Sequence, residues 1–366
     1  MKTAVLAITR RGVELGRRVV AALRKEGHAV RLLVPARFAD GSPGEEAFTA
    51  PPARVLAEEF AQSRGLVLIM ALGIVVRLLA PLVKDKRLDP AVVVMDEKGR
   101  FVISALSGHL GGANDLAQSL AGALGAIPVI TTATDVQGRP AVDMLARRYA
   151  LAMEPFTAVR PVNAALVNGD KVTFCSQFSL PLPRADGVEI IPWMEFPPAN
   201  TDGWLVLITN RVLPPPTART LFLRPRNLVA GIGCRRDIPP EFLREALELA
   251  LNRAGCSPLS LRALATVDLR LHEPALHRMA RDMSLPLLGF TREQIGRLYE
   301  SAGVELSYSD FVYERIGVGG VCEAVALLAS PRGRLLLRKT SHRGVTVALA
   351  EESSSWWEPD PEMSPI

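Results

Sequence analysis

The sequence is poor in aromatic side chains and contains neither a long apolar run nor a long basic run. Aromatic residues make up 5% of its 366 residues. Proteins that bind nucleic acids combine basic patches with aromatic stacking platforms, so this composition argues against such a partner. No apolar run reaches the roughly 18 residues that a membrane-spanning helix needs. We therefore expect contact with neither nucleic acid nor membrane.

Cysteine and histidine are also scarce, with four and five residues respectively. Cys175, Cys234, Cys256 and Cys322 show no paired spacing and no companion histidines. This pattern favours reduced thiols over a disulfide framework or a zinc site. The apolar stretch 1–8 is too short to act as a signal peptide. The sequence thus predicts a cytoplasmic protein that itself holds no metal.

The charge balance is mildly basic. Forty-three lysine and arginine residues against 38 acidic ones give a net charge of +5 and an isoelectric point near 9.2. Such a balance favours an acidic ligand only weakly. The length suggests two or three domains, and 48% hydrophobic residues suffice for sizeable cores.

Apolar strands alternate with amphipathic helices at both ends of the chain, a pattern typical of α/β folds. We predict two three-layer α/β/α units, the first with a largely parallel sheet, joined by a smaller strand-containing middle region. The predicted boundaries are 1–139, 140–226, 227–352 and a mobile tail at 353–366. Within the proline-rich middle region, Pro214–Pro216 and Arg224–Arg226 have the character of linkers.

A strand-to-helix turn dense in reactive and flexible residues follows the apolar stretch 101–106. Leucines recur every four residues from Leu116 to Leu124, which predicts a helix after the turn. The first N–H groups of a helix lack intrahelical partners and can bind an anion. Alternatively, the glycines only shape a tight turn, Asn114 or Asp115 caps the helix and the histidine merely packs. The candidate residues here are Ser107, Gly108, His109, Gly111, Gly112, Asn114 and Asp115.

A second glycine-containing turn lies between a strand near 229 and a helix ending near 254. Gly231 and Gly233 are followed by Arg235 and Arg236, whose guanidinium groups suit a carboxylate or phosphate. The third glycine of a dinucleotide-binding fingerprint is missing, because Arg236 stands in its place. Solvated surface arginines are the alternative interpretation.

Three carboxylates and one lysine complete the candidate set. Asp268 ends a predicted strand, and Glu273 precedes a proline that opens a helix. Glu323 follows a glycine run at the start of another helix, and Lys339 ends a strand. Each has an ordinary structural explanation: Glu273 can cap its helix, Glu323 can complement a helix dipole, and Lys339 can protect a sheet edge.

The order of motifs along the chain closely resembles that of the CbiG family of cobalamin biosynthesis proteins. The resemblance rests on SGHLGGANDLA, PVITTATD, VAGIGCRR, ATVDL with EPAL, GVGGVCEAVALLA, and RKT followed by VTVALAEE, and it spans nearly the whole chain. It implies hydrolysis of cobalt-precorrin-5A in the anaerobic pathway. In that reaction the ring A lactone opens, and carbon–carbon cleavage releases acetaldehyde to give cobalt-precorrin-5B.

That reaction needs an activated water, a site for the oxyanion and a proton for the leaving alkoxide. His109 is the candidate base and acid, and the N–H groups at 111 to 113 are candidates for the oxyanion site. Asn114 is a second donor, Asp115 orients the imidazole, and Glu323 is an assisting carboxylate. The conjugated macrocycle can act as electron sink, so we expect no cofactor; cobalt is carried by the substrate.

We expect a cleft between the two α/β units, with His109 on one wall and Arg235, Glu273, Glu323 and Lys339 on the other. A homo-oligomer and transient contact with neighbouring pathway enzymes both stay open. Two other functions compete with hydrolysis. A non-enzymatic tetrapyrrole carrier would use the same basic groups without chemistry, and a nucleotide or sugar-phosphate enzyme is favoured only by the glycine turns.

Overall fold

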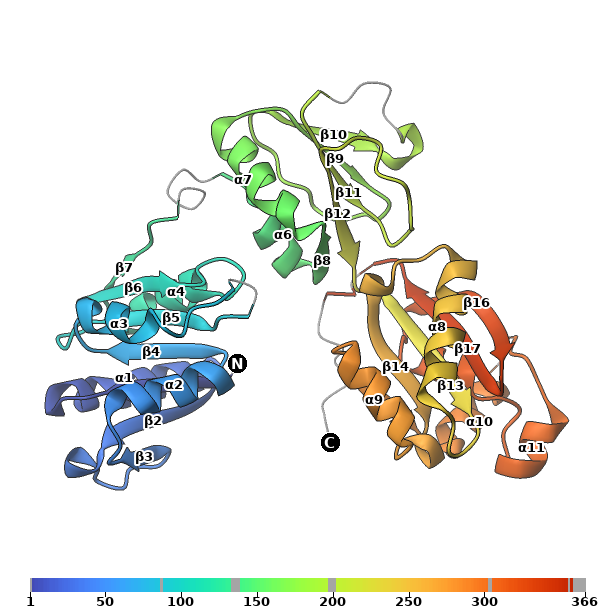
Figure 1. Ribbon diagram of the computed structural model, residues 1–366, viewed down its shortest axis with the longest axis horizontal. Helices are drawn as coiled ribbons and strands as arrows, with labels where there is room; N and C mark the ends of the chain where they lie inside the picture. The colour runs from blue at the N-terminus through green and yellow to red at the C-terminus, as the bar shows by residue number, and fades with distance from the viewer. Residues whose placement is uncertain are drawn as a thin grey trace. The chain divides into compact units, whose positions relative to one another are not determined.

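The computed structural model describes residues 2–85, 88–132, 139–196, 202–301, 305–354 and 356–357. The chain forms two compact units, residues 1–139 and 140–366. Figure 1 shows them in blue to cyan and in green to red. Among the described residues, no helix is long and apolar enough to cross a bilayer.

The first unit is built on a seven-stranded sheet in the order β3-β2-β1-β4-β5-β6-β7. Its strands are β1 (Lys2–Ala7), β2 (Ala29–Pro35), β3 (Glu45–Phe48), β4 (Gly65–Ile69), β5 (Ala91–Met95), β6 (Phe101–Leu106) and β7 (Ile127–Val129). Its helices are α1 (Arg10–Lys25), α2 (Pro52–Gln62), α3 (Leu72–Leu79) and α4 (Ala113–Leu124).

Helices cover both faces of this sheet because its central strands are apolar on both sides. Successive residues of a strand point to opposite faces. Accordingly, Val5 packs in one cluster with α1 and α4. Leu6 packs in the other cluster with α2 and α3. The unit is therefore a three-layer α/β/α sandwich, as the alternating pattern predicted.

The sheet departs from the largely parallel arrangement at β6. Strands β1 to β5 run parallel, whereas β6 is antiparallel to β5, and β7 is parallel to β6. The reason is local, since only residues 96–100 connect β5 to β6 and a parallel pair needs a crossover of a dozen residues or more. The carboxyl end of β6 consequently lies beside the amino end of β5, at the sheet edge opposite the carboxyl ends of β1 to β5.

The middle region forms a five-stranded sheet in the order β10-β9-β11-β12-β8, in which β8 runs antiparallel to β12. Helices α6 and α7 pack against one face. Its elements are α6 (Val142–Arg148), β8 (Leu151–Glu154), α7 (Val159–Asn168), β9 (Val172–Ser176), β10 (Val188–Pro192), β11 (Trp204–Ile208) and β12 (Thr220–Pro225).

The linker interpretation of Arg224–Arg226 is wrong for Arg224. This residue lies on β12, pairs in register with Ala152 of β8 and is 3% exposed. A charged residue beside a proline is typical of a loop. In the structure, the preceding residues Phe222 and Leu223 are buried in the core of the region, and the strand continues through Arg224.

The C-terminal region repeats the three-layer arrangement around the sheet β15-β14-β13-β17-β16. Helices α8 and α9 pack against one face, and α10 and α12 pack against the other. The elements are β13 (Leu228–Cys234), α8 (Pro240–Ala254), β14 (Leu261–Val267), α9 (Pro274–Asp282), β15 (Leu287–Phe290), α10 (Arg292–Glu300), α11 (Asp310–Ile316), α12 (Cys322–Leu328), β16 (Gly333–His342) and β17 (Val345–Glu352).

Buried side-chain hydrogen bonds join this region and the residues after it to the middle region within the second unit. The buried Asn210 amide donates to Glu351 (2.8 Å) and to Asn227 (3.2 Å). The indole of Trp356, 3% exposed, donates to the Tyr149 carbonyl (2.8 Å). The mobile tail predicted from residue 353 is therefore wrong for Trp356 and Trp357, whose rings pack edge to face. The packing of these two aromatic rings against the middle region fixes this part of the chain, although the sequence around them is polar. Ser355 and residues 358–366 lie outside the described residues.

Candidate functional site

The first candidate site is the turn 107–112 between β6 and α4. Ser107 has a φ of 57°, a left-handed conformation that is costly for a residue with a side chain. Gly112, with a φ of 90°, is the N-cap of α4. A side chain at Gly111 would collide with Ser107, whose carbonyl oxygen would lie 2.8 Å away. The glycines are thus required by the folding of the turn itself.

The turn uses most of the N–H groups that we expected to face an oxyanion. The backbone N–H of Gly112 donates to the carbonyl oxygen of His109 (3.0 Å). In the same way, the N–H of Ala113 donates to the carbonyl oxygen of Ser107 (3.1 Å), and that of Asn114 to the carbonyl oxygen of Gly108 (3.0 Å). The predicted oxyanion site at 111 to 113 is therefore wrong for residues 112 and 113. Because the chain turns back on itself, carbonyl oxygens of the same turn already accept the hydrogen bonds of these N–H groups.

Asn114 is 2% exposed and holds three segments together. Its amide oxygen accepts a hydrogen bond from Ser104 (2.6 Å), and its amide nitrogen donates to Thr132 (2.9 Å). A side chain at Gly108 would approach the amide oxygen to 2.6 Å. These contacts give Asn114 an anchoring role. Sequence reasoning missed Ser104 and Thr132, because their proximity arises from the β6–β7 pairing.

His109 lies at the centre of the turn and is partly exposed, and Asp115 is exposed in the first turn of α4. The Ser107 hydroxyl donates to the Asp89 carbonyl (3.1 Å), which fixes the turn beside the amino end of β5. The imidazole therefore lies on a loop that several hydrogen bonds hold in place. Its catalytic role stays a prediction, as does the orienting role of Asp115.

The second turn differs from the expected anion site at its glycines. Gly231 is buried beneath α12, where a Cβ atom would collide with the Cys322 carbonyl oxygen and lie 2.8 Å from the Ala326 nitrogen. At Gly233 a Cβ atom would lie 2.6 Å from the Thr346 hydroxyl. Ligand contact at Gly231 is thus wrong, since the absent side chain lets a helix approach the strand.

Gly231→Ala is expected to lower the free energy of unfolding by about 1–3 kcal/mol, the usual cost of overpacking. The backbone of α12 must move to admit the methyl group. Urea unfolding followed by circular dichroism measures the effect. Gly296→Ala in α10 is the matched control, because nothing lies within 4 Å of its Cβ position. Equal stability of the Gly231 variant and the wild type would contradict the packing role.

The carboxyl ends of β13, β14 and β15 meet at one edge of the C-terminal sheet, because these strands are parallel. Arg235 and Arg236 follow β13, and both are exposed. Among the described residues neither forms an ion pair, so their guanidinium groups are available to a ligand. Asp268 and Glu273 follow β14 at the same edge. The structure therefore brings these four predicted residues to one edge.

Local contacts at this edge involve two residues that sequence reasoning missed, Arg270 and Asp237. Arg270 donates to the Cys234 carbonyl (3.0 Å), and the N–H of Asp237 donates to Glu273 (3.3 Å). Burial and the Glu273 carboxylate raise the pKa of the Cys234 thiol to about 11, partly offset by Arg270. Cys234 is therefore a protonated thiol at neutral pH and a poor nucleophile.

Glu323 is held as a structural anchor. It is 2% exposed and accepts hydrogen bonds from the backbone N–H (2.6 Å) and hydroxyl (2.9 Å) of Ser307 and from the backbone N–H of Lys339 (2.8 Å). Burial alone would raise its pKa, but these donors outweigh it and lower the pKa below the ordinary value. The exposed Lys339 meets Glu323 through its backbone. The catalytic role of Glu323 and the binding role of Lys339 stay predictions.

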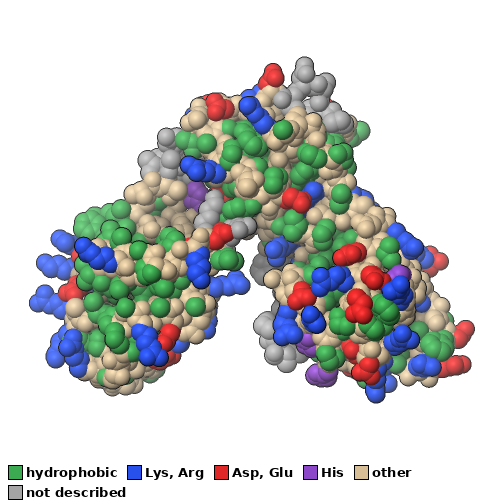
Figure 2. Space-filling view, viewed as in Figure 1, with side chains coloured by type: hydrophobic (Ala, Val, Ile, Leu, Met, Phe, Trp, Pro, Cys, Tyr) green, Lys and Arg blue, Asp and Glu red, His purple; other side chains and the backbone are tan. Residues whose placement is uncertain are grey.

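The visible face of the first unit and that of the C-terminal region differ in charge (Figure 2). On the face drawn in Figure 2, the first unit shows more Lys and Arg than acidic side chains at its rim. The C-terminal region shows both signs side by side. Within the described ranges, no group of three or more His, Cys, Asp or Glu side chains is placed to hold a metal ion. The predicted cleft between the units stays a prediction, because each unit is described by itself.

Three family models match the chain in succession. Cobalamin synthesis G N-terminal matches residues 54–135, the Cobalamin biosynthesis central region matches 140–225, and Cobalamin synthesis G C-terminus matches 228–350. A solved structure of a cobalamin biosynthesis protein G homolog from Sulfolobus solfataricus matches with a TM-score of 0.42 and 19% identity. That match covers 96% of this chain and 97% of that one.

Two curated relatives cover most of the chain. Cobalt-precorrin-5A hydrolase from Salmonella typhimurium is 40% identical over 301 residues, which are 81% of this chain and 84% of the relative. The protein of the same name from Priestia megaterium is 31% identical over 362 residues, which are 95% of this chain and 94% of the relative. With three successive family models and this identity over most of its length, the chain belongs to the CbiG family of cobalamin biosynthesis proteins.

Proposed function

We propose that this chain catalyses the reaction after which its relatives are named, the hydrolysis of cobalt-precorrin-5A. The observation that carries the proposal is 40% identity to a named hydrolase over 81% of the chain. The ring A lactone opens, and a two-carbon fragment leaves as acetaldehyde. We further propose that the reaction takes place in the cytoplasm and that cobalt enters as part of the substrate. No organic cofactor is then needed.

His109 is the proposed proton-transfer group, because it is a partly exposed histidine on a turn held by backbone hydrogen bonds. It takes a proton from the attacking water and returns one to the departing alkoxide. Ser107, with its strained backbone, holds the start of that turn. On the second unit, Arg235 and Arg236 supply guanidinium groups for the acetate and propionate arms at the rim of the ring.

Acetaldehyde release separates an enzyme from a carrier. Purified protein is incubated anaerobically with excess cobalt-precorrin-5A, and acetaldehyde is trapped and quantified. Release of many equivalents per chain supports the hydrolase. Binding of the substrate without release of acetaldehyde would instead identify a tetrapyrrole carrier.

Arg235→Ala is expected to raise the substrate KM by about tenfold while lowering kcat much less, because a guanidinium–carboxylate contact remote from the reacting atoms holds substrate and transition state alike. Steady-state acetaldehyde release at varied substrate concentration measures both constants. Arg253→Ala, which removes an exposed arginine from α8, is the control. An unchanged KM would show that Arg235 is a surface residue without a ligand.

A further inference from the structure

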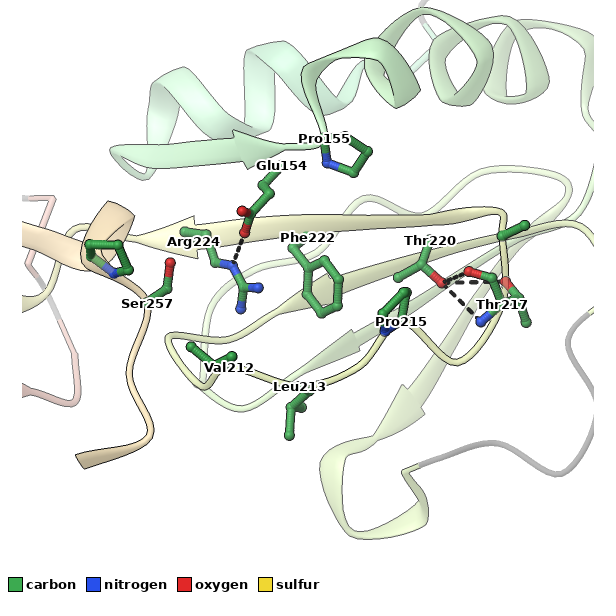
Figure 3. A pocket seen from close by; sticks show the side chains of 12 residues that line it. Glu154, Pro155, Val212, Leu213, Pro215, Thr217, Thr220, Phe222, Arg224 and Ser257 are labelled. Atoms are coloured by element: carbon green, nitrogen blue, oxygen red, sulfur yellow. Dashed lines mark hydrogen bonds and ion pairs between the residues drawn. The ribbon is translucent and has the colours of Figure 1, made fainter. Parts of the chain in front are cut away.

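A cavity of about 530 Å³ lies within the second unit, and its lining includes no residue of either glycine turn. Figure 3 shows it between β8 and β12 of the middle region and the chain around Val212 and Leu213, with Ser257 at one end. Pro155, Leu213, Pro215 and Phe222 give it largely apolar walls. Its size falls in the range of small-molecule pockets, roughly 300–1,000 Å³.

One charged side chain, Arg224, is buried in the wall of this cavity. Its side chain is 4% exposed. Nε donates to the Glu154 carboxylate (2.9 Å), and Nη1 donates to the carbonyl oxygens of Thr209 (3.2 Å) and Arg211 (2.6 Å). Among the described residues, the other terminal nitrogen, Nη2, has no hydrogen-bond partner. Nη2 is not one of the buried polar atoms without a partner, so it keeps access to solvent at the cavity wall and can donate to a ligand there.

The surroundings of the guanidinium favour an acidic ligand with an apolar body. Burial lowers the pKa of Arg224, and the Glu154 carboxylate only partly offsets this. Glu154 is itself 45% exposed, so its charge is screened by solvent. The Arg224 carbon Cζ lies over the Phe222 ring, 4.1 Å from its centroid, so the charge stacks on an aromatic ring that also lines the cavity. A second carboxylate would stabilise the buried charge further.

We propose that this cavity binds one carboxylate-bearing edge of the corrin ring, with Nη2 of Arg224 donating to the carboxylate and Phe222 and Pro155 contacting the apolar part. The identity of the ligand rests on the proposed function, whereas the cavity and its unused donor do not. A single free donor suits one carboxylate arm better than a phosphate. The cavity thus adds a substrate-binding subsite in the middle region.

The test fills the cavity from its exposed rim and leaves Arg224 in place. Ala218 lines the cavity and is exposed, so Ala218→Trp occupies its mouth with little effect on the core. Val212→Trp does the same from a second position that is 59% exposed. Ile190→Trp, on the edge strand β10 and outside the cavity lining, is the matched control. Circular dichroism and thermal unfolding establish that each variant is folded.

Binding is measured with two probes on the full chain. The first is cobyrinic acid, a cobalt corrin with free carboxylates, and the second is the same ring with its carboxylates converted to primary carboxamides. We expect Ala218→Trp and Val212→Trp to raise the Kd of the acid at least tenfold. Their preference for the acid over the amide should also be smaller than that of the wild type. Ile190→Trp should bind both probes like the wild type.

Each outcome decides one proposal without deciding the other. An unchanged Kd in both rim variants, or no binding of the acid to the wild-type chain, would overturn the subsite. Acetaldehyde release by the wild type together with an unchanged Kd would leave the hydrolase standing without the subsite. Weakened binding in the rim variants with no acetaldehyde release by the wild type would leave the subsite standing and refute the hydrolase.

Discussion

His109→Gln is expected to lower kcat for acetaldehyde release by roughly 10²–10⁴, the usual effect of losing a general acid–base group. Glutamine retains hydrogen-bonding capacity but does not titrate near neutral pH, so the proton transfers in lactone opening lose their carrier. Substrate affinity should change little, because the binding groups proposed for the carboxylate arms stay in place. The measurement is anaerobic single-turnover release of acetaldehyde, with binding followed separately by absorbance.

His277→Gln is the control, since His277 is an exposed histidine on α9. It should turn over substrate at the wild-type rate. The turn around His109 is fixed by backbone hydrogen bonds from Gly112, Ala113 and Asn114, so the Gln variant should keep its fold. A folded His109→Gln protein with turnover within threefold of the wild type would remove His109 from the mechanism.

Glu323→Ala is expected to destabilise the protein by about 3 kcal/mol, because three partly buried hydrogen bonds lose their buried acceptor, each at a cost of about 1 kcal/mol. The donors belong to Ser307 and Lys339, so the loop before α11 and strand β16 both lose their attachment to α12. Urea unfolding gives the free energy. A hundredfold loss of kcat with unchanged stability would instead restore the catalytic role predicted from the sequence.

Glu323→Gln tests the contribution of the carboxylate charge to stability, because glutamine has nearly the same shape but no charge. The folded state lowers the pKa of Glu323, so this carboxylate contributes stability above its unfolded-state pKa and loses that contribution as the pH falls through its folded-state pKa. The Gln variant should be less stable than the wild type at pH 7, and the difference should shrink below pH 4. A difference independent of pH would contradict this account.

The sequence predicted most strands and helices because their patterns are local. The apolar strand 101–106 and the four-residue leucine spacing after Leu116 lie where β6 and α4 lie. The turn between them and the one at Arg235 were also found, because glycine and charged residues together are a local signal. The family followed from the order of such motifs along the chain.

What the sequence did not predict depends on contacts between distant segments. The antiparallel direction of β6 placed the turn 107–112 at the amino end of β5. The backbone of that turn then used the N–H groups expected to bind an anion. Gly231 resembled a ligand-binding glycine, but its neighbour is Cys322, ninety-one positions later in the chain. Arg224 resembled a linker residue because Glu154, its partner, lies seventy positions earlier.

The burial of Trp356 has a consequence for the order in which the chain folds during synthesis. The core of the middle region contains Trp356, whose ring contacts that of Phe178. The ribosome must therefore produce more than 350 residues before that core can close, whereas every strand and helix of the first unit has emerged long before. We expect a nascent chain halted before Trp356 to carry a finished first sandwich and a middle region that still exposes apolar surface to chaperones.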